Sequence, residues 1–184
     1  DMLLKQSLTL AHCRIGWVPF AVALLLGAVP ATAPGNRTAE PAMTGKDVPV
    51  AIVAAETYSG LDRPTSRLIR SEDELKAVWK RIHRGRQPLP PLPVVDFERD
   101  MLILVAMGSR NSGGFGIDVA RVLRDDAALH ILVRTRCPAP DAIVTMALVQ
   151  PMQLVKVAAG DQKPNFIDQP EPSCVRFNTA SGHR

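Results

Sequence analysis

The residues of this chain that could do chemistry are a serine beside two glycines and a small set of histidines. Ser112 follows Asn111 and precedes Gly113 and Gly114. A nucleophilic serine needs a histidine base within hydrogen-bond reach, an acid that orients this base, and donors that stabilise the oxyanion. The chain has four histidines, His12, His83, His130 and His183. Their sequence surroundings decide whether a catalytic set is indicated.

Two fragments resemble the signatures of chymotrypsin-like serine proteases. Residues 9–13 resemble the sequence around the general base, and residues 111–114 resemble the sequence around the nucleophile. The first fragment contains His12, but it lies upstream of an apolar export segment and would be removed with it. The second has Arg110-Asn111 where Gly-Asp is expected, and no motif surrounds the other histidines. We therefore predict no catalytic residues and a protein that is not an enzyme.

Cys137 and Cys174 are the cysteines that remain once the N-terminal residues up to the end of the export segment, Cys13 among them, are removed. An even number of cysteines in an exported protein favours a disulfide. A zinc site that adds His130 and His183 is the alternative, but the spacing of typical zinc ligands is missing. We expect a disulfide, no metal and no cofactor, because the phosphate-binding and dinucleotide-binding glycine patterns are absent too.

Binding through the main chain is better supported than catalysis in the glycine loop, residues 108–115. The loop joins the apolar run 101–107 to the alternating run 115–122, which predicts two strands connected by an exposed turn. An arginine can form charge-assisted hydrogen bonds, glycines permit close backbone approach, and a phenylalanine can anchor in a partner's pocket. The candidate partner-binding residues are Arg110, Asn111, Ser112, Gly113, Gly114 and Phe115. The alternative is that the two glycines only satisfy a tight hairpin.

The N-terminal residues have the pattern of a secretory signal: a weakly basic lead, an uncharged apolar stretch over residues 15–29, and small residues after it. We expect residues 1–33 to be a signal peptide and residues 34–46 a disordered leader. Residues 47–184 are then one domain with a flexible C-terminal tail. The protein would be periplasmic or secreted by a bacterium, with membrane contact only through an uncleaved signal.

Alternating and β-branched runs predict strands at short spacing. We expect them at residues 48–58, 66–70, 101–107, 115–122, 129–133, 143–149 and 152–157, with a short edge at 165–167. Ser71 and Glu74 form a capping box ahead of an apolar face that repeats at helical spacing, from Leu75 to Ile82. The pattern predicts an α+β fold: a strand-dominated antiparallel sheet or sandwich-like domain with one main α-helix.

Charge and aromatic content argue against nucleic acid as a partner. The formal net charge is +4, and aromatic residues make up 4% of the chain. Stacking on bases needs aromatic side chains among basic ones, which this composition does not supply. The predicted helix has a basic side, which we interpret as a solvated face, with an acidic partner or a membrane surface as the alternative.

An ordered set of features between residues 66 and 168 resembles one known family. The set comprises the capped helix with Trp79 and His83, a proline-rich crossover into residues 95–97, the apolar strand that ends at Met107-Gly108, residues 113–115, Cys137 in a proline-rich turn, residues 144–148 followed by Pro151, and residues 155–157. Together they resemble the C-terminal domain of the PrcB family, accessory subunits of an exported bacterial protease complex.

The resemblance implies a non-catalytic interaction module that binds or stabilises an exported protein, such as a serine protease, through the glycine loop. The chain departs from the family in having Asn111-Ser112 before the glycines and Phe115 where the family has tyrosine. The loop also resembles, more distantly, the glycine-containing loop of chagasin-type peptidase inhibitors. A peptidase inhibitor that uses the same loop, or a small-molecule-binding domain, is therefore the alternative.

Overall fold

The computed structural model describes residues 45–175. The predicted signal peptide, residues 34–44 of the predicted leader and residues 176–184 of the predicted tail lie outside the described residues. Lys46, the last residue of the predicted leader, already belongs to a strand, because it pairs with Arg124. The folded domain thus extends one residue further toward the N-terminus than the sequence predicts.

The described chain forms eight strands and one α-helix of more than one turn. In chain order they are β1 (Lys46–Asp47), β2 (Ala51–Glu56), β3 (Pro64–Ile69), α1 (Glu72–Ile82), β4 (Asp100–Met107), β5 (Gly116–Arg124), β6 (Ala128–Arg136), β7 (Met152–Ala158) and β8 (Lys163–Pro170). The prediction of a strand-dominated α+β domain with one main helix is confirmed.

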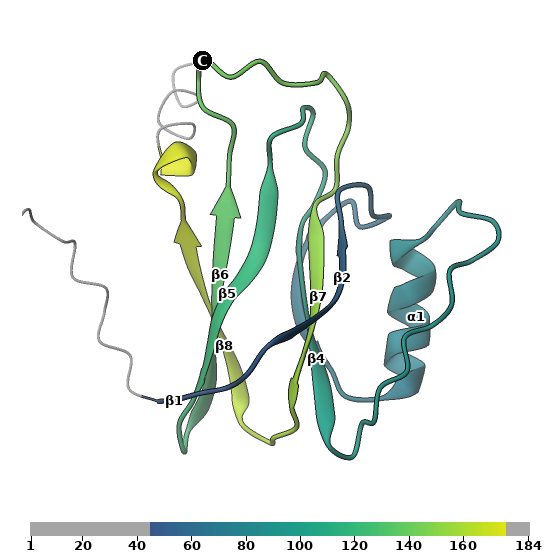
Figure 1. The fold of residues 1–184 in the computed structure, drawn as a ribbon, viewed down its shortest axis with the longest axis vertical. Coiled ribbons are helices and arrows are strands. Elements are labelled where there is room, and N and C mark those ends of the chain that lie inside the picture. The colour runs from purple at the N-terminus through teal and green to yellow at the C-terminus, as the bar shows by residue number, and fades with distance from the viewer. Residues whose placement is uncertain (1–44, 176–184) are drawn as a thin grey trace, which may run out of the picture. The chain divides into compact units, whose positions relative to one another are not determined.

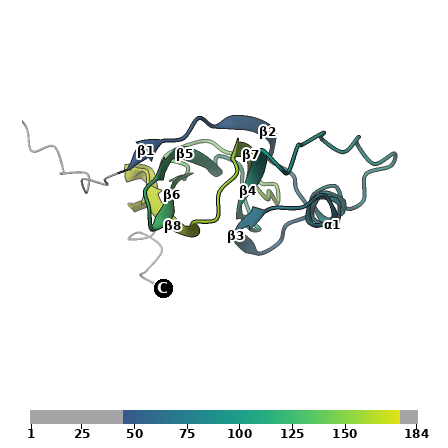
Figure 2. The same ribbon diagram turned by 90° about the horizontal axis from the view of Figure 1, so that it is seen from below.

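The strands form two four-stranded sheets that face each other. One sheet has the order β1-β5-β6-β8 and the other has the order β2-β7-β4-β3. Figure 1 shows the sheets side by side, with α1 on the outer side of the second sheet. Figure 2 shows the same layers from below, with the chain passing from β1 to β2 along one side of the sandwich. The arrangement is a sandwich covered on one outer face by a helix.

Two apolar clusters hold these layers together, and β4 contributes to both. Met101, Ile103 and Val105 face the first sheet, where they pack with side chains of β5, β6 and β7. Leu102 and Leu104 face the other way and pack with α1. All five side chains are buried. Burial on both faces explains why this strand reads as a continuous apolar run rather than an alternating one.

The helix begins and packs as its sequence predicts. The Ser71 side chain accepts a hydrogen bond from the Glu74 amide, while the Glu74 carboxylate accepts one from the amide of Arg70 (2.8 Å). The apolar face lies in the second cluster, and the Trp79 indole donates to the carbonyl of Pro90 (2.9 Å) in the proline-rich crossover. The crossover is therefore laid against the helix.

Three predictions about strands need correction. The glycine loop does not close a hairpin, because β4 and β5 lie in different sheets. Residues 143–148 are not a strand, and only Val149 and Gln150 form isolated bridges. The last strand, β8, is an edge strand as expected, but it runs parallel to β6. The first two errors have one cause: the chain changes sheet at these points, and local periodicity does not report which sheet a strand joins.

Candidate functional site at one end of the sandwich

Most of the long connections gather at one end of the sandwich, the upper end in Figure 1. The strands β2, β4, β6 and β8 end there and β3, β5 and β7 begin there, as their pairing registers require. The end of α1 joins them, since the Gly60 amide donates to the carbonyl of Ile82 (2.8 Å). Residues 57–63, the glycine loop and residues 137–151 therefore share this end.

The two glycines of the loop allow the chain's own backbone to pack closely over it. A Cβ atom added at Gly113 would lie 2.6 Å from the Thr145 hydroxyl oxygen. Gly114 has φ +84°, and its added Cβ would lie 2.9 Å from Pro138. The Gly113 amide also donates to the carbonyl of Thr145 (2.8 Å). The sequence predicts that a partner approaches the glycines closely. In the structure, residues 138–148 of the same chain make this approach, and we call them the covering segment.

Arg110 and Phe115 bracket the loop and contact each other. The Arg110 main chain exchanges two hydrogen bonds with Val149, each 2.8 Å. Its guanidinium lies 5.8 Å from the centroid of the Phe115 ring, within the range of a cation–π contact. Both side chains are half-buried, whereas Asn111 is exposed. Of the candidate residues, Asn111 and parts of Arg110, Ser112 and Phe115 are the side chains that a partner could reach.

Ser112 is not placed in a catalytic set. In the part of the chain that the structure describes, no hydrogen bond joins it to a histidine. His130 lies toward the other end of the sandwich, where its Nε2 contacts the Asp125 carboxylate (2.8 Å) and its Nδ1 contacts the Asn165 amide (3.2 Å). The hydrogen bond between Asp125 and His130, together with two main-chain amides, lowers the pKa of Asp125 to about 2. One ring nitrogen of His130 therefore contacts the β5–β6 turn, and the other contacts Asn165 of β8.

The covering segment presents apolar side chains to solvent. Ile143 is fully exposed, Met146 is 87% exposed, and Leu148 is 59% exposed. Tyr58, which forms a bridge with Gln150 just after the segment, is 57% exposed. Sequence reasoning missed this surface because it assigned these residues to a strand. The signals that could have revealed it are the prolines at 138 and 140, which keep the segment out of a ladder.

Both ends of the covering segment are fixed. The predicted disulfide is confirmed: Cys137 and Cys174 are bonded, with their Cα atoms 4.8 Å apart. It joins the start of the segment to a helical turn at residues 172–175 that follows β8. At the other end, Val149 pairs with Arg110. The exposed apolar side chains therefore sit on a restrained chain rather than on a loose loop.

A second feature of the same end is a cavity of about 200 Å³ between residues 60–63 and the end of α1. Three arginines line it, Arg63, Arg81 and Arg84, together with Asp62. We call it the arginine cavity. Arg81 and Arg84 belong to the basic side of the predicted helix, which the sequence indicates as a solvated face, and Arg63 joins them from another element.

Among residues 45–175, no three side chains of the histidine, cysteine, aspartate or glutamate type gather as metal ligands would. Within the same residues, no helix has the length and apolar character needed to span a membrane.

A comparison with protein families supplies an independent observation. Residues 101–158 match the family model described as PrcB C-terminal. This segment of the chain is PrcB-like. The match confirms the resemblance inferred from sequence over the central part of residues 66–168. No curated protein and no solved structure matches the chain.

The PrcB-like segment coincides with much of the candidate site. It runs from β4 through the glycine loop, β5, β6 and the covering segment to the end of β7. The α1 helix and the arginine cavity lie outside it. The covering segment thus lies within the matched segment, and the residues that line the arginine cavity precede it.

Proposed function

We propose that this protein is a non-catalytic, exported subunit that binds a protease outside the cytoplasm through the upper end of its sandwich. The PrcB-like segment supports an association with a protease complex. The observation that carries the choice of surface is the covering segment, which holds Ile143, Met146 and Leu148 exposed while both of its ends are fixed. Neighbouring exposed apolar side chains on a restrained segment are typical of protein interaction sites.

The glycine loop has a supporting part in this proposal. It lies beneath the covering segment and holds it through the contact of Gly113 with Thr145 and the pairing of Arg110 with Val149. Asn111, at the exposed rim of the loop, can add a polar contact to the partner. The surface offered to the protease is then the covering segment with the loop's rim, rather than the glycines themselves.

The inhibitor alternative is less well supported by this geometry. A loop that inserts into a peptidase cleft must project from its scaffold, whereas residues 113–114 are packed against Pro138 and Thr145. The small-molecule alternative has a different basis, a cavity of about 420 Å³ at the other end of the sandwich, between residues 46–49 and the Arg124–Asp126 turn. This volume falls in the range of small-ligand sites, about 300–1,000 Å³.

The test begins with the mature protein purified from its native envelope fraction. We expect a peptidase to co-purify in stoichiometric amount and to remain proteolytically active in the complex. In the double variant Ile143→Ser/Met146→Ser, recovery of the peptidase should fall at least tenfold, because two apolar anchors are lost, each of which contributes about 1–2 kcal/mol.

Val94→Ser is the matched control, because Val94 is also fully exposed but lies in the crossover before β4. It should leave recovery unchanged. Failure to recover any peptidase with the wild-type protein would contradict the proposal. Equal recovery with the Ile143/Met146 variant would contradict the choice of surface. Loss of peptidase activity in the complex would favour the inhibitor instead.

A further inference from the structure

The arginine cavity has a rigid floor. The Gly60 amide binds the Ile82 carbonyl, and a Cβ added at Gly60 would collide with the carbonyl oxygen of Arg81, so only glycine allows this approach. On one side of Gly60, the buried Ser59 hydroxyl donates to the carbonyl of Gln150 (2.8 Å). On the other side, Leu61 is buried in the cluster beneath α1. The loop that carries Asp62 and Arg63 is therefore held against the end of the helix.

The charges around the cavity do not balance. Arg84 binds the Asp62 carboxylate (2.9 Å), which is the only carboxylate among the lining residues. Within residues 45–175, neither Arg63 nor Arg81 has a carboxylate within ion-pair distance. Two of the three lining arginines, both exposed, thus have no carboxylate partner among the described residues. Such groups repel each other unless an anion lies between them.

The helix end does not supply the missing negative charge. The carbonyl groups of the last turn of α1 carry partial negative charge, but several are already used. The carbonyl of Ile82 accepts from Gly60, that of Trp79 accepts from His83, and that of Arg81 accepts from Arg84. The charged side chains that line the cavity, three arginines and Asp62, therefore carry a net positive charge.

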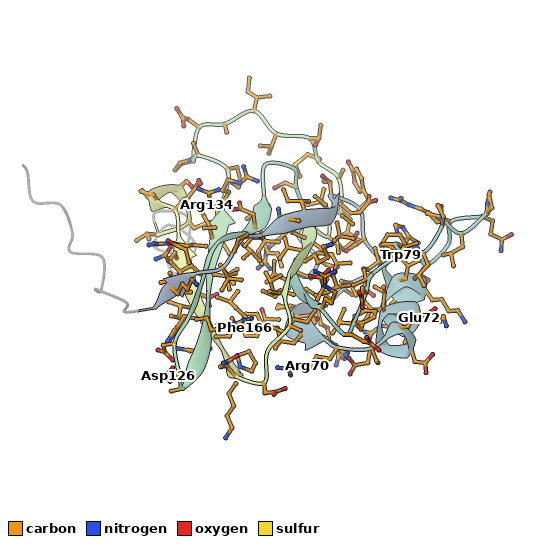
Figure 3. The ribbon with its side chains drawn as sticks, turned by 60° about the horizontal axis from the view of Figure 1, so that its bottom comes forward. Arg70, Glu72, Trp79, Asp126, Arg134 and Phe166 are labelled. Atoms are coloured by element: carbon orange, nitrogen blue, oxygen red, sulfur yellow. A yellow bond between two sulfur atoms is a disulfide. The ribbon has the colours of Figure 1, made fainter. Side chains whose placement is uncertain are left out.

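The arginine cavity and the glycine loop belong to one framework. The Asp62 carbonyl accepts a hydrogen bond from the Ser109 amide (3.0 Å), at the start of the glycine loop. Gly108, which precedes Ser109, has φ +74°, and a Cβ added to it would lie 2.8 Å from Pro64. In Figure 3, Glu72 and Trp79 mark the direction of α1, whose final turn leads to this framework. A protein that covers the upper end of the sandwich meets an apolar and a basic region on the same scaffold.

We propose that the arginine cavity binds an acidic side chain, aspartate or glutamate, of the protease partner. The inference rests on the proposed function and adds the chemistry of the contact. The planar guanidinium fork matches a carboxylate in two parallel hydrogen bonds, and two of the arginines that line the cavity have no carboxylate partner among the described residues. A volume of about 200 Å³ is smaller than most sites for free ligands and admits one side chain. The basic side of α1 is then a recognition surface at its final turn.

The first experiment uses a probe that does not depend on the protease. An N-acetylated hexaglutamate peptide is titrated into the isotope-labelled full chain, and amide shifts are followed by NMR. We expect saturable shifts at residues 60–63 and 81–84. Arg63→Ala/Arg81→Ala should weaken binding about tenfold, since two charge-assisted pairs are lost. Thermal melting of each variant confirms that it is folded.

Lys80→Ala/Lys163→Ala is the control, because it removes the same charge from exposed positions outside the cavity. It should retain the peptide's saturable shifts. Equal weakening in the control would overturn the proposal, since it would mean attraction to overall charge only. A hexaglutamine peptide should give no shifts. If inorganic phosphate competes as well as hexaglutamate at equal charge, the cavity is a general anion site and the assignment to an acidic side chain is overturned.

The second experiment separates this inference from the proposed function. If a protease co-purifies, its affinity for the Arg63/Arg81 variant should fall about tenfold, and its dependence on salt concentration should weaken. If the Arg63/Arg81 variant binds both the protease and hexaglutamate as the wild-type protein does, the proposed role of the arginine cavity is overturned and the proposed function is kept. Binding of hexaglutamate at the cavity with no protease recovered would overturn the function but keep the acidic specificity of the cavity.

Discussion

At the scale of single residues, His83 is unusual because it is buried without a polar partner. Its side chain is 3% exposed, and neither ring nitrogen has a hydrogen-bond partner within the described chain. The ring packs edge-on against Trp79, with centroids 4.3 Å apart. Burial lowers the pKa of His83 from its ordinary value of 6.5, the nearby Arg86 lowers it further, and Glu56 partly opposes both. The folded protein therefore favours the neutral ring.

This environment predicts a loss of stability in mild acid. Because the unfolded chain binds a proton on His83 at a higher pH than the folded chain does, the histidine's effect on stability is fully favourable above pH 6.5 and declines below it. We expect the free energy of unfolding, measured with denaturant, to fall between pH 7 and pH 5. His83→Phe keeps a ring against Trp79 but cannot titrate, so this part of the decline should disappear. An identical decline in the variant would contradict the assignment.

At the scale of elements, two glycines with the same backbone conformation have different surroundings. Gly114 has φ +84° and packs against Pro138 and Val144, whereas Gly85 has φ +88° and nothing within 4 Å of its added Cβ. Gly85→Ala should cost only the backbone strain of about 1 kcal/mol. Gly114→Ala should cost about 2–4 kcal/mol, because strain and a steric clash add. Denaturant unfolding of both variants measures the difference, and equal losses would mean that the covering segment moves away without cost.

The disulfide is the other restraint on the covering segment. It closes a separation of 37 residues, for which the chain-entropy model gives about 3–4 kcal/mol. We expect Cys137→Ala/Cys174→Ala to lose about this much stability. Hydrogen exchange at the Gly113 amide, which donates to Thr145, should also accelerate by more than the global change explains. Unchanged exchange there would show that the segment is held by its other contacts.

Elements with strong local signals could be predicted from the sequence, and those that depend on the crossing between sheets could not. Helix α1 has its own cap and apolar face, and β4 is a long apolar run. The apolar residues of 143–148 resemble those of a strand equally well. Their exposure follows from Pro138 and Gly114, which bring the chain over the glycine loop instead of into a ladder. The prolines at 138 and 140 are a local signal against a ladder, but the apolar pattern of residues 143–148 does not by itself distinguish these two outcomes.

At the scale of the whole domain, β4 is the centre of the layers. It pairs with β3 on one side and β7 on the other, and both of its faces are covered. We expect its amides from Leu102 to Val105 to exchange most slowly with solvent, at the rate of global unfolding. The amides of β8, an edge strand with residues 163–165 and 168 exposed, should exchange faster. Slower exchange in β8 than in β4, measured by NMR, would contradict this ranking.

The candidate site depends on this larger scale, which explains how much of it sequence reasoning could find. The glycine loop was found because its composition is unusual within eight consecutive residues. The arginine cavity needs residues 60–63 and the end of α1 to meet, and their meeting depends on the packing of Leu61 and the hydrogen bond of Gly60 to Ile82. Proximity between separate elements is a property of the tertiary structure, so a single sequence does not reveal it.

The fixed ends of the covering segment have a consequence for how such a protein can change. The disulfide and the Val149 pairing set where residues 138–148 begin and end, and Ile143 and Met146 contribute little to the core. Substitutions at these two positions can therefore alter partner preference while the sandwich folds as before. With the covering segment as the proposed binding surface, binding specificity and fold stability are encoded by different residues. A lineage could then exchange one partner for another without passing through unfolded intermediates, and an engineer could do the same with a library confined to this short stretch.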